Sequence, residues 1–305
     1  MDTSQRPGDD SLDEAADAFL ELRPRLFGIA YRVLGSVDEA EDVVQDAWLR
    51  WQGTDRSAVA NPGAFLTTAT TRLAINVAQS ARVRRAAHVG SWLPEPVDTS
   101  VDPHVGAERG EAVELAVLLL LEKLNPVERA AYVLREAFDY PYDQIANVLG
   151  LSQANARQIV SRSRKRLSAE RREPVDTAEY RRLLEAFVAA AETGDIDALE
   201  NLLSADVIAY ADGNGMRGVA RIPVLGTVRV ARISSFAKKF IPWDEYRIVE
   251  ANGLPALLAV KDGVAIALLA ISAGRGVIDE FYWILTPDKL RAFERSSQRA
   301  VPRRP

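Results

Sequence analysis

Apolar residues recur at three- and four-residue steps through the first half of the chain, beginning with Leu22, Leu26 and Ile29. This spacing places apolar side chains on one face of an α-helix, so it predicts a series of amphipathic helices. Gly35 marks the end of the first helix, and Ser36 begins the second with a capping box. The predicted helices span about residues 19–34, 37–51, 63–85, 108–124, 126–138, 142–149 and 153–171.

The pattern changes after Glu173-Pro174. Two further helices, at about 177–193 and 196–203, are followed by strand-like runs separated by turns such as Asn252-Gly253. Helices followed by several antiparallel strands indicate an α+β domain. The predicted strands span residues 207–211, 247–251, 256–261, 264–272 and 277–285.

A segment without periodicity, residues 88–106, contains three prolines and two glycines and is predicted to be an extended linker. The chain therefore divides into small helical modules on both sides of this linker and a separate C-terminal domain. We expect an acidic tail (1–15), a helical module (16–87), the linker (88–107), a second helical module (108–172), an α+β domain (176–291) and a basic tail (292–305).

Composition narrows the chemistry of this 305-residue chain. It has no cysteine, which excludes disulfides and thiolate sites, and its two histidines, His88 and His104, both fall in the linker. This removes much of the metal and nucleophile chemistry. We expect no metal site and no cofactor, and we assign no catalytic residue. The longest apolar run, residues 115–121, is too short to span a bilayer, and the acidic N-terminus has no secretory pattern. A cytoplasmic protein without a membrane partner is expected.

The net charge of −5 hides one strongly basic helix. The two helices over residues 142–167 are separated by a short turn at Gly150, which is typical of a helix-turn-helix unit. The second helix exposes arginine and glutamine side chains that can read base edges, and further cations that can hold phosphates. The alternative is a solvated basic surface in an ordinary helical hairpin. The predicted contacts to DNA are Arg157, Gln158, Ser161, Arg162, Arg164 and Lys165.

The first module combines an acidic, aromatic helix with a helix that ends in arginines. Tryptophan at a partly exposed position often marks a protein interface, although one of the two tryptophans, Trp48 and Trp51, is expected in the core. The acidic helix is the candidate protein-binding surface and the basic helix a candidate nucleic-acid surface. The candidate protein contacts are Asp42, Gln45, Asp46, Trp48 and Leu49.

Together these segments resemble the extracytoplasmic-function (ECF) sigma factors of bacterial RNA polymerase. The resemblance covers residues 18–168 and includes DEAEDVVQDAWLRW from Asp38, AFLTTATTRLAINVAQSARVRR from Ala64 and the region around the helix-turn-helix. It implies that the first two segments bind the β′ clamp of core polymerase and the promoter −10 element, and that the last reads the −35 element beside the β flap. The −10 contacts it implies are Asn61, Arg72, Asn76, Gln79 and Arg82.

Three further motifs are similar to those of a sigma-factor group with a fused SnoaL-like, NTF2-type domain: WLPEP at residues 92–96, DGNGMR at 212–217 and TPDKL at 286–290. Asn214, Met216 and Thr286 depart from the usual form of the last two. The resemblance implies an α+β cone that regulates the sigma modules by intramolecular docking, without an obligatory anti-sigma factor. The residues assigned to this role are Trp92, Leu93, Pro94, Glu95, Pro96, Asp212, Gly213, Gly215, Arg217, Pro287, Asp288, Lys289 and Leu290.

Other functions remain open at this stage. SnoaL-like domains elsewhere include cyclases and isomerases that use a carboxylate base in an apolar cone, for which the candidates are Asp212, Tyr210, Asp279 and Tyr282. A related hypothesis is that the C-terminal domain binds a small ligand without catalysing a reaction. A stand-alone helix-turn-helix repressor or activator is the remaining alternative.

Overall fold

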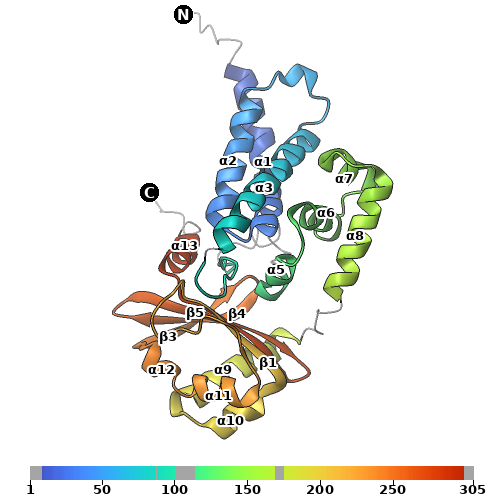
Figure 1. Cartoon of the computed structure of the whole chain (residues 1–305). Coiled ribbons are helices and arrows are strands. Elements are labelled where there is room, and N and C mark those ends of the chain that lie inside the picture. Colours follow the sequence, from blue (N-terminus) through green and yellow to red (C-terminus); the bar gives the residue numbers. More distant parts are fainter. Residues whose placement is uncertain (1–8, 87, 101–113, 169–174, 299–305) are drawn as a thin grey trace, which may run out of the picture. The chain divides into compact units, whose positions relative to one another are not determined.

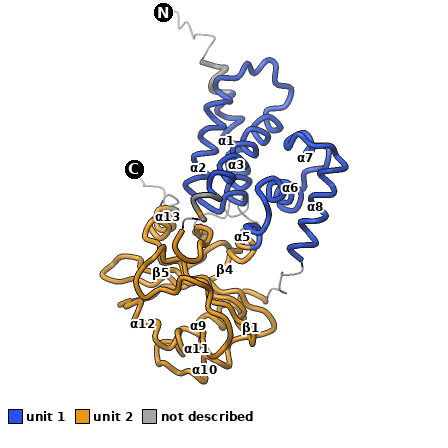
Figure 2. Tube along the Cα trace, in the orientation of Figure 1, with its two compact units in different colours: residues 1–82, 107–111, 120–169 blue, residues 83–106, 112–119, 170–305 orange. Residues whose placement is uncertain are grey.

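The structure of the chain is a computed structural model that describes all residues except 1–8, 87, 101–113, 169–174 and 299–305. His104, Arg171 and Arg172 thus lie outside the described residues. The chain forms two compact units (Figure 2). The first takes the described residues of 1–82 and 120–169, and the second those of 83–106, 112–119 and 170–305.

The first unit is helical, as predicted (Figure 1). Its helices agree with the predicted ones to within a few residues, except at the start of α1; residues 108–113 of the helix predicted around α5 lie outside the described residues. The C-terminal end of α3 and most of α5 belong to the second unit. The elements are α1 (Asp9–Leu34), α2 (Val37–Gln52), a 3-10 helix (Arg56–Ala58), α3 (Pro62–Ala86), α5 (Leu115–Leu121), α6 (Pro126–Glu136), α7 (Tyr142–Leu149) and α8 (Gln153–Ser168).

Helix α1 begins at Asp9, within the segment predicted as an acidic tail. The cause is tertiary, because the indole Nε1 of Trp51 donates to the carbonyl oxygen of Ala15 at 3.1 Å. Trp51 is buried and also packs on Phe65, with ring centroids 5.5 Å apart. Trp51 is therefore the tryptophan that belongs to the core, and its contact with α1 keeps the beginning of that helix in place.

The helical modules on either side of the linker share core contacts in the first unit. Ile29 of α1 packs in one apolar cluster with side chains from α6, α7 and α8, including Leu134 and Val160. The buried Arg129 crosses between the modules, donating to the carbonyl oxygen of Val33 at 2.7 Å and pairing with Glu122 at 2.5 Å. A buried guanidinium needs such partners, because an unpaired buried charge costs several kcal/mol.

The second unit is built on a six-stranded sheet with the order β2-β1-β6-β5-β4-β3, in which β1 and β6 are parallel and the other neighbours antiparallel. Four helices cover one face and α13 lies on the other (Figure 1). The elements are α9 (Thr177–Thr193), α10 (Ile196–Leu202), β1 (Leu203–Asp212), β2 (Val224–Leu225), α11 (Thr227–Ser234), α12 (Ala237–Phe240), β3 (Glu245–Ala251), β4 (Leu254–Lys261), β5 (Val264–Gly274), β6 (Val277–Ile284) and α13 (Pro287–Gln298).

The helical side of the sheet is filled by a continuous apolar core around α9. Phe187 of α9 packs on Phe281 of β6 with ring centroids 4.6 Å apart. The buried phenol of Tyr180 donates to the carbonyl oxygen of Ile271 at 2.6 Å and accepts from its N–H at 3.1 Å. This pair of bonds ties the beginning of α9 to the middle of β5.

Four short elements were not predicted from the pattern: β2, α11, α12 and α13. Residues 292–298, expected to belong to a basic tail, are part of α13, where Ala292 and Phe293 are buried. The sequence pattern did not indicate this apolar face, because charged residues flank Ala292 and Phe293 along the chain. Among the described helices, none is long and apolar enough to cross a membrane.

Burial makes the second unit sensitive to alkali. It raises the pKa of Tyr180 and of Tyr282 above the ordinary value of about 10. Above that pH the unfolded chain releases phenolic protons that the folded chain retains, so stability falls as pH rises. Urea unfolding followed by circular dichroism at pH 8 and above pH 10 should show this loss.

The variant Tyr180→Phe removes the phenolic hydroxyl group and keeps the buried aromatic ring. It should lower the free energy of unfolding at pH 8 by about 1–3 kcal/mol, because the backbone of Ile271 loses a buried partner. It should also reduce the alkaline loss. Tyr246→Phe, at an exposed position, is the control and should change neither quantity. An unchanged pH dependence in Tyr180→Phe would contradict this account.

Candidate functional site

The helix-turn-helix is formed by α7 and α8 (Figure 1). Gly150 ends α7 in the left-handed region, with φ 66°, where glycine has no steric cost. The Oγ of Ser152 accepts from the N–H of Asn155 at 3.2 Å and caps α8. Ala156 and Val160 face the core. This leaves the predicted DNA contacts on the outside of α8, where all are exposed: Arg157, Gln158, Ser161, Arg162, Arg164 and Lys165.

Two of these arginines have partners within the helical module. Arg157 lies over the ring of Tyr142, which Arg135 also approaches, each guanidinium being 5.2 Å from the ring centroid. Arg164 pairs with Glu136 at 2.6 Å, and this carboxylate raises the pKa of Arg164. Arg157 is therefore oriented by an aromatic ring, whereas the charge of Arg164 is partly neutralised.

The predicted −10 contacts lie in or beside α3 but do not form one uniform surface. Asn76 and Gln79 are exposed, and Asn61 caps the helix, its Oδ1 accepting from the N–H of Ala64 at 2.9 Å. Arg72 instead donates to two carbonyl oxygens at the end of α7, those of Val148 at 2.8 Å and Asn147 at 3.2 Å. The side chain of Arg82 lies outside the described residues.

Helix α2 carries an acidic and partly apolar exposed surface. Asp42, Gln45 and Asp46 are exposed, and Leu49 is 56% exposed, which is unusual for a leucine. Trp48 is half-buried against Phe19, with ring centroids 4.9 Å apart. The five candidate protein contacts are thus accessible to different degrees along one helix.

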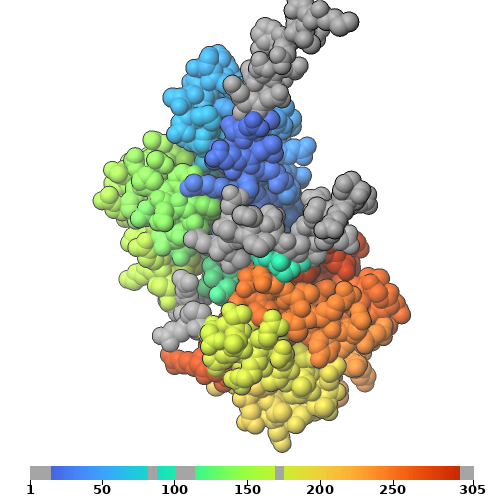
Figure 3. Space-filling model, turned by 180° about the vertical axis from the view of Figure 1, so that it is seen from behind, coloured from blue at the N-terminus to red at the C-terminus, as the bar shows by residue number. Residues whose placement is uncertain are grey.

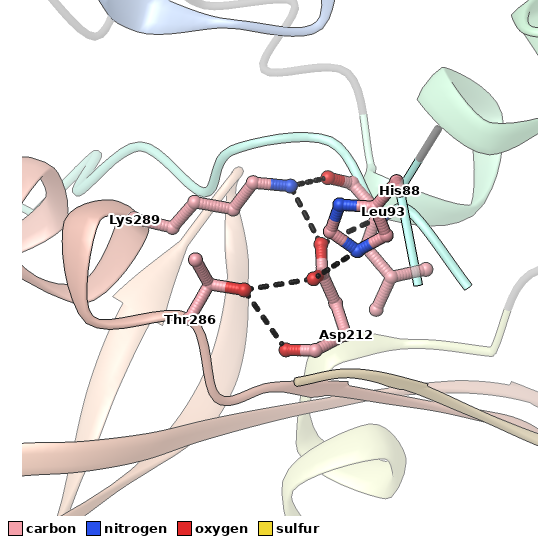
Figure 4. A network of polar contacts seen from close by, with 5 residues as sticks. All are labelled: His88, Leu93, Asp212, Thr286 and Lys289. Atoms are coloured by element: carbon pink, nitrogen blue, oxygen red, sulfur yellow. Dashed lines mark hydrogen bonds and ion pairs between the residues drawn. The ribbon is translucent and has the colours of Figure 1, made fainter. Parts of the chain in front are cut away.

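The carboxylate of Asp212 is the centre of a buried polar network in the second unit (Figure 4). Its Oδ2 accepts from Lys289 Nζ at 2.6 Å and from the N–H of Leu93 at 2.9 Å. Its Oδ1 accepts from Thr286 Oγ1 at 2.8 Å and lies 3.0 Å from His88 Nε2. Asp212 is fully buried, and this set of donors satisfies the acceptor capacity of a carboxylate. Three distant segments of sequence therefore meet at one side chain.

Lys289 completes the network. Its ammonium donates to the carbonyl oxygen of Leu93 as well as to Asp212. Burial lowers the pKa of Lys289, while the carboxylate of Asp212 opposes that shift. Two cations contact the ring of Trp92, with Lys289 Nζ 4.5 Å and Arg85 Cζ 3.6 Å from its centroid. Both polar groups of Leu93 and the ring of Trp92 are thus held by the C-terminal domain and the end of α3.

The linker beyond Leu93 continues along the domain, where its teal atoms lie against orange atoms of the C-terminal domain (Figure 3). Asn252 accepts from the N–H of Val97 at 3.0 Å and donates its own N–H to Val97 at 2.8 Å. Asp98 forms an isolated bridge with Ala251. Leu93, Pro94, Pro96, Val97 and Asp98 are buried. The predicted extended linker is therefore ordered on the second unit over these residues.

The glycines of the Asp212 turn are required by close approach. A Cβ on Gly213 would lie 2.9 Å from Val219 Cγ1, and Gly215, at φ 82°, donates its N–H to Val89 at 3.0 Å. Of the remaining predicted residues, Leu290 is buried and Glu95 half-buried, whereas Arg217, Pro287 and Asp288 are exposed. The assigned set thus includes both contact residues and exposed neighbours.

Sequence reasoning missed His88, Asn252 and Arg85 as partners of the linker. His88 could have been suspected as one of only two histidines in the chain. Asn252 was interpreted as a turn residue, and its φ of 54° confirms the turn. Its second role, pairing with Val97, has no signal in the sequence because it depends on the path of the linker.

The candidate enzyme site does not present a free base. Both oxygens of Asp212 are occupied, and alternation along β1 and β6 places Tyr210 and Tyr282 on the face away from α9, with ring centroids 5.8 Å apart. Tyr282 donates to Glu280, and burial raises the pKa of its phenol. Asp279 is buried. The small-ligand hypothesis stays a prediction.

A helix-turn-helix with a basic recognition helix, beside a helical module with an acidic surface, is the arrangement expected of a DNA-binding transcription protein that also contacts a protein partner. Comparisons with known proteins agree. The sigma-70 region 2 model matches residues 18–87, and the sigma-70 region 4 model matches residues 114–167.

The chain is similar over almost its whole length to the ECF RNA polymerase sigma factor SigJ of Mycobacterium tuberculosis, with 36% identity over 93% of this chain and 96% of that protein. It is 30% identical to the probable sigma factor SigI of the same species over 92% of this chain and 97% of that protein. The crystal structure of SigJ matches with a TM-score of 0.73 and 32% identity, covering 90% of this chain and 98% of that one. The chain belongs to the ECF sigma factors and directs promoter-specific transcription initiation.

The buried pair of Asp212 and Lys289 should be a large contributor to the stability of the second unit. Asp212→Asn keeps the shape but leaves the ammonium of Lys289 buried without a counter-charge. We expect it to lower the free energy of unfolding by about 3–5 kcal/mol, measured in urea. Asp262→Asn, at an exposed aspartate in the turn between β4 and β5, is the matched control and should cost less than about 0.5 kcal/mol.

The double variant Asp212→Asn/Lys289→Met tests whether the charge is the cause. Removing both charges should recover a substantial part of the loss, because no buried charge is then unpaired. Equal stability of Asp212→Asn and the wild type would show that the pair does not anchor the linker.

Proposed function

We propose that the exposed surface of α8 reads the −35 element of the promoter. The support is the set of side chains that remain accessible on α8 after the core is formed, above all Arg157 and Gln158. Both residue types can bond bidentately to purine edges in the major groove. Arg157 is also pre-oriented by the ring of Tyr142, which lowers the entropy lost on binding. Arg162, Lys165 and Arg164 would hold phosphates, Arg164 after exchanging Glu136 for DNA.

The acidic surface of α2 is proposed to bind the β′ clamp of core polymerase, and the module around α8 to lie at the β flap. The exposed Leu49, beside Asp42 and Asp46, supports this assignment because an apolar centre with a charged rim is typical of protein interfaces. The surface of α3 around Asn76 and Gln79 would contact the −10 element. Arg72 would join it only after leaving the end of α7. A cytoplasmic location follows from this role.

The fused C-terminal domain is proposed to regulate initiation by holding the linker. The observation that carries this proposal is the network at Asp212, which fixes Leu93 by both its N–H and its carbonyl oxygen. A linker held in this way cannot at the same time follow a different path on the polymerase. Because the regulator is part of the chain, a separate anti-sigma factor is not obligatory.

Two variants, measured by run-off transcription with sigma-free core polymerase, test the DNA-binding surface and the polymerase-binding surface separately. Arg157→Ala should retain core binding but lose discrimination at one −35 position by about 1–3 kcal/mol, or roughly 5- to 150-fold. Leu49→Ser should weaken core binding and leave the −35 preference unchanged. Each variant is the control for the other, and a loss of both properties in either one would contradict the assignment.

Linker release is tested in the full chain with Trp92→Ala and Asp212→Asn, compared with the exposed control Asp262→Asn. The first two should change the amount of run-off transcript in the same direction, because both loosen the same segment. The control should behave like the wild type. If transcript levels stay unchanged while proteolysis shows the linker released, the docked linker has no regulatory role.

A further inference from the structure

One stretch of the second unit differs in charge from the rest of the molecule. Residues 213–243 contain six basic side chains and no acidic one, in a chain whose net charge is −5. All six are exposed, and within the described residues only Lys238 has an ion pair, with Glu192 at 3.9 Å. The basic residues are Arg217, Arg221, Arg229, Arg232, Lys238 and Lys239.

The same stretch carries an unusual share of exposed apolar side chains. Thirteen large hydrophobic residues are exposed in the described part of the chain, and seven of them fall in this tenth of the sequence. Their exposed fractions reach 75% for Ile222 and 60% for Phe240. We call this surface the basic-apolar patch. Its apolar members are Met216, Ile222, Leu225, Val228, Ile233, Phe236 and Phe240.

Most of the patch lies on β2, α11 and α12, of which the two helices lie on the helical side of the sheet (Figure 1). Met216, Arg217, Arg221 and Ile222 belong to the segment between β1 and β2. On α11, Val230 and Ala231 face the core, so Val228 and Ile233 lie outward together with Arg229 and Arg232. On α12, Phe236 and Phe240 are four residues apart and therefore on one side of the turn. Apolar and basic side chains thus alternate on a protruding surface.

Exposed apolar clusters of this size mark interaction sites in proteins, and the charge restricts the partner. A second copy of the same patch is disfavoured, because its cations, of which only Lys238 has an ion pair among the described residues, would face the same cations of the other copy. Duplex DNA would use the cations but gain nothing from isoleucine and phenylalanine side chains, since its backbone contacts are polar. An anionic lipid surface uses both, with phosphates for the cations and acyl chains for the apolar side chains.

We propose that the basic-apolar patch binds the surface of membranes that contain anionic lipid. The sequence predicted no membrane partner because it has no spanning segment, and peripheral binding does not need one. Val228, Ile233, Phe236 and Phe240 insert to the level of the acyl boundary, while Arg229, Arg232 and Lys239 contact phosphates. This proposal is independent of the promoter and polymerase contacts proposed for the first unit.

The test is co-sedimentation of the full chain with vesicles of phosphatidylcholine alone and of phosphatidylcholine mixed with phosphatidylglycerol. The chain should sediment with the anionic vesicles at low salt and be released at about 1 M salt, where the screening length is about 3 Å. Arg229→Gln/Arg232→Gln should lower the partition coefficient about 25-fold, since each cation contributes about fivefold. Phe236→Ala/Phe240→Ala should lower it about tenfold or more.

Matched controls lie elsewhere in the same domain. Val264→Ala removes an equally exposed apolar side chain, at 60%, from the turn between β4 and β5, and Arg275→Gln removes an exposed cation from the next turn. Both should bind vesicles like the wild type. Circular dichroism and thermal unfolding of each variant show whether the domain remains folded.

Three outcomes would overturn the proposal. The first is no sedimentation with anionic vesicles at low salt, and the second is binding that the patch variants leave unchanged. The third is evidence that the patch binds another partner. The patch variants would then reduce binding to random duplex DNA, or abolish self-association in sedimentation velocity, without changing vesicle binding.

Discussion

The buried carboxylate of Asp212 is the interaction on which the second unit depends. It lies at the end of β1, yet its donors come from the linker, from the turn after β6 and from α13. A buried charge is tolerated only when its partners are in place, so these segments must assemble together. The ammonium of Lys289 extends the same requirement to the carbonyl oxygen of Leu93.

This requirement gives the linker a definite path. Once Leu93 is fixed, Pro94 and Pro96 restrict the backbone, and Val97 reaches Asn252 on the turn between β3 and β4. The face of the sheet opposite α9 is then covered by chain that precedes the domain in sequence. The linker over these residues and the C-terminal domain therefore form one structural unit.

In the first unit, arginines perform a related task. Arg129 and Arg72 cross between the helical modules and bind main-chain carbonyl oxygens, of Val33 in one case and Val148 in the other. Because Arg72 is also a candidate DNA contact, the same side chain serves packing in this structure and would have to be released for promoter binding.

The sequence by itself determined the helices of the first unit, α9 and α10, most strands, the helix-turn-helix and the presence of the linker motif, because periodicity, caps and turns such as Gly150 act locally. It also placed Asp212, Leu93 and Lys289 in one group, through resemblance to a sigma-factor group. Only the tertiary structure decided that His88, Arg85 and Asn252 join them and that α1 begins at Asp9. These features depend on contacts between residues far apart in the chain, and the local sequence pattern does not indicate such contacts.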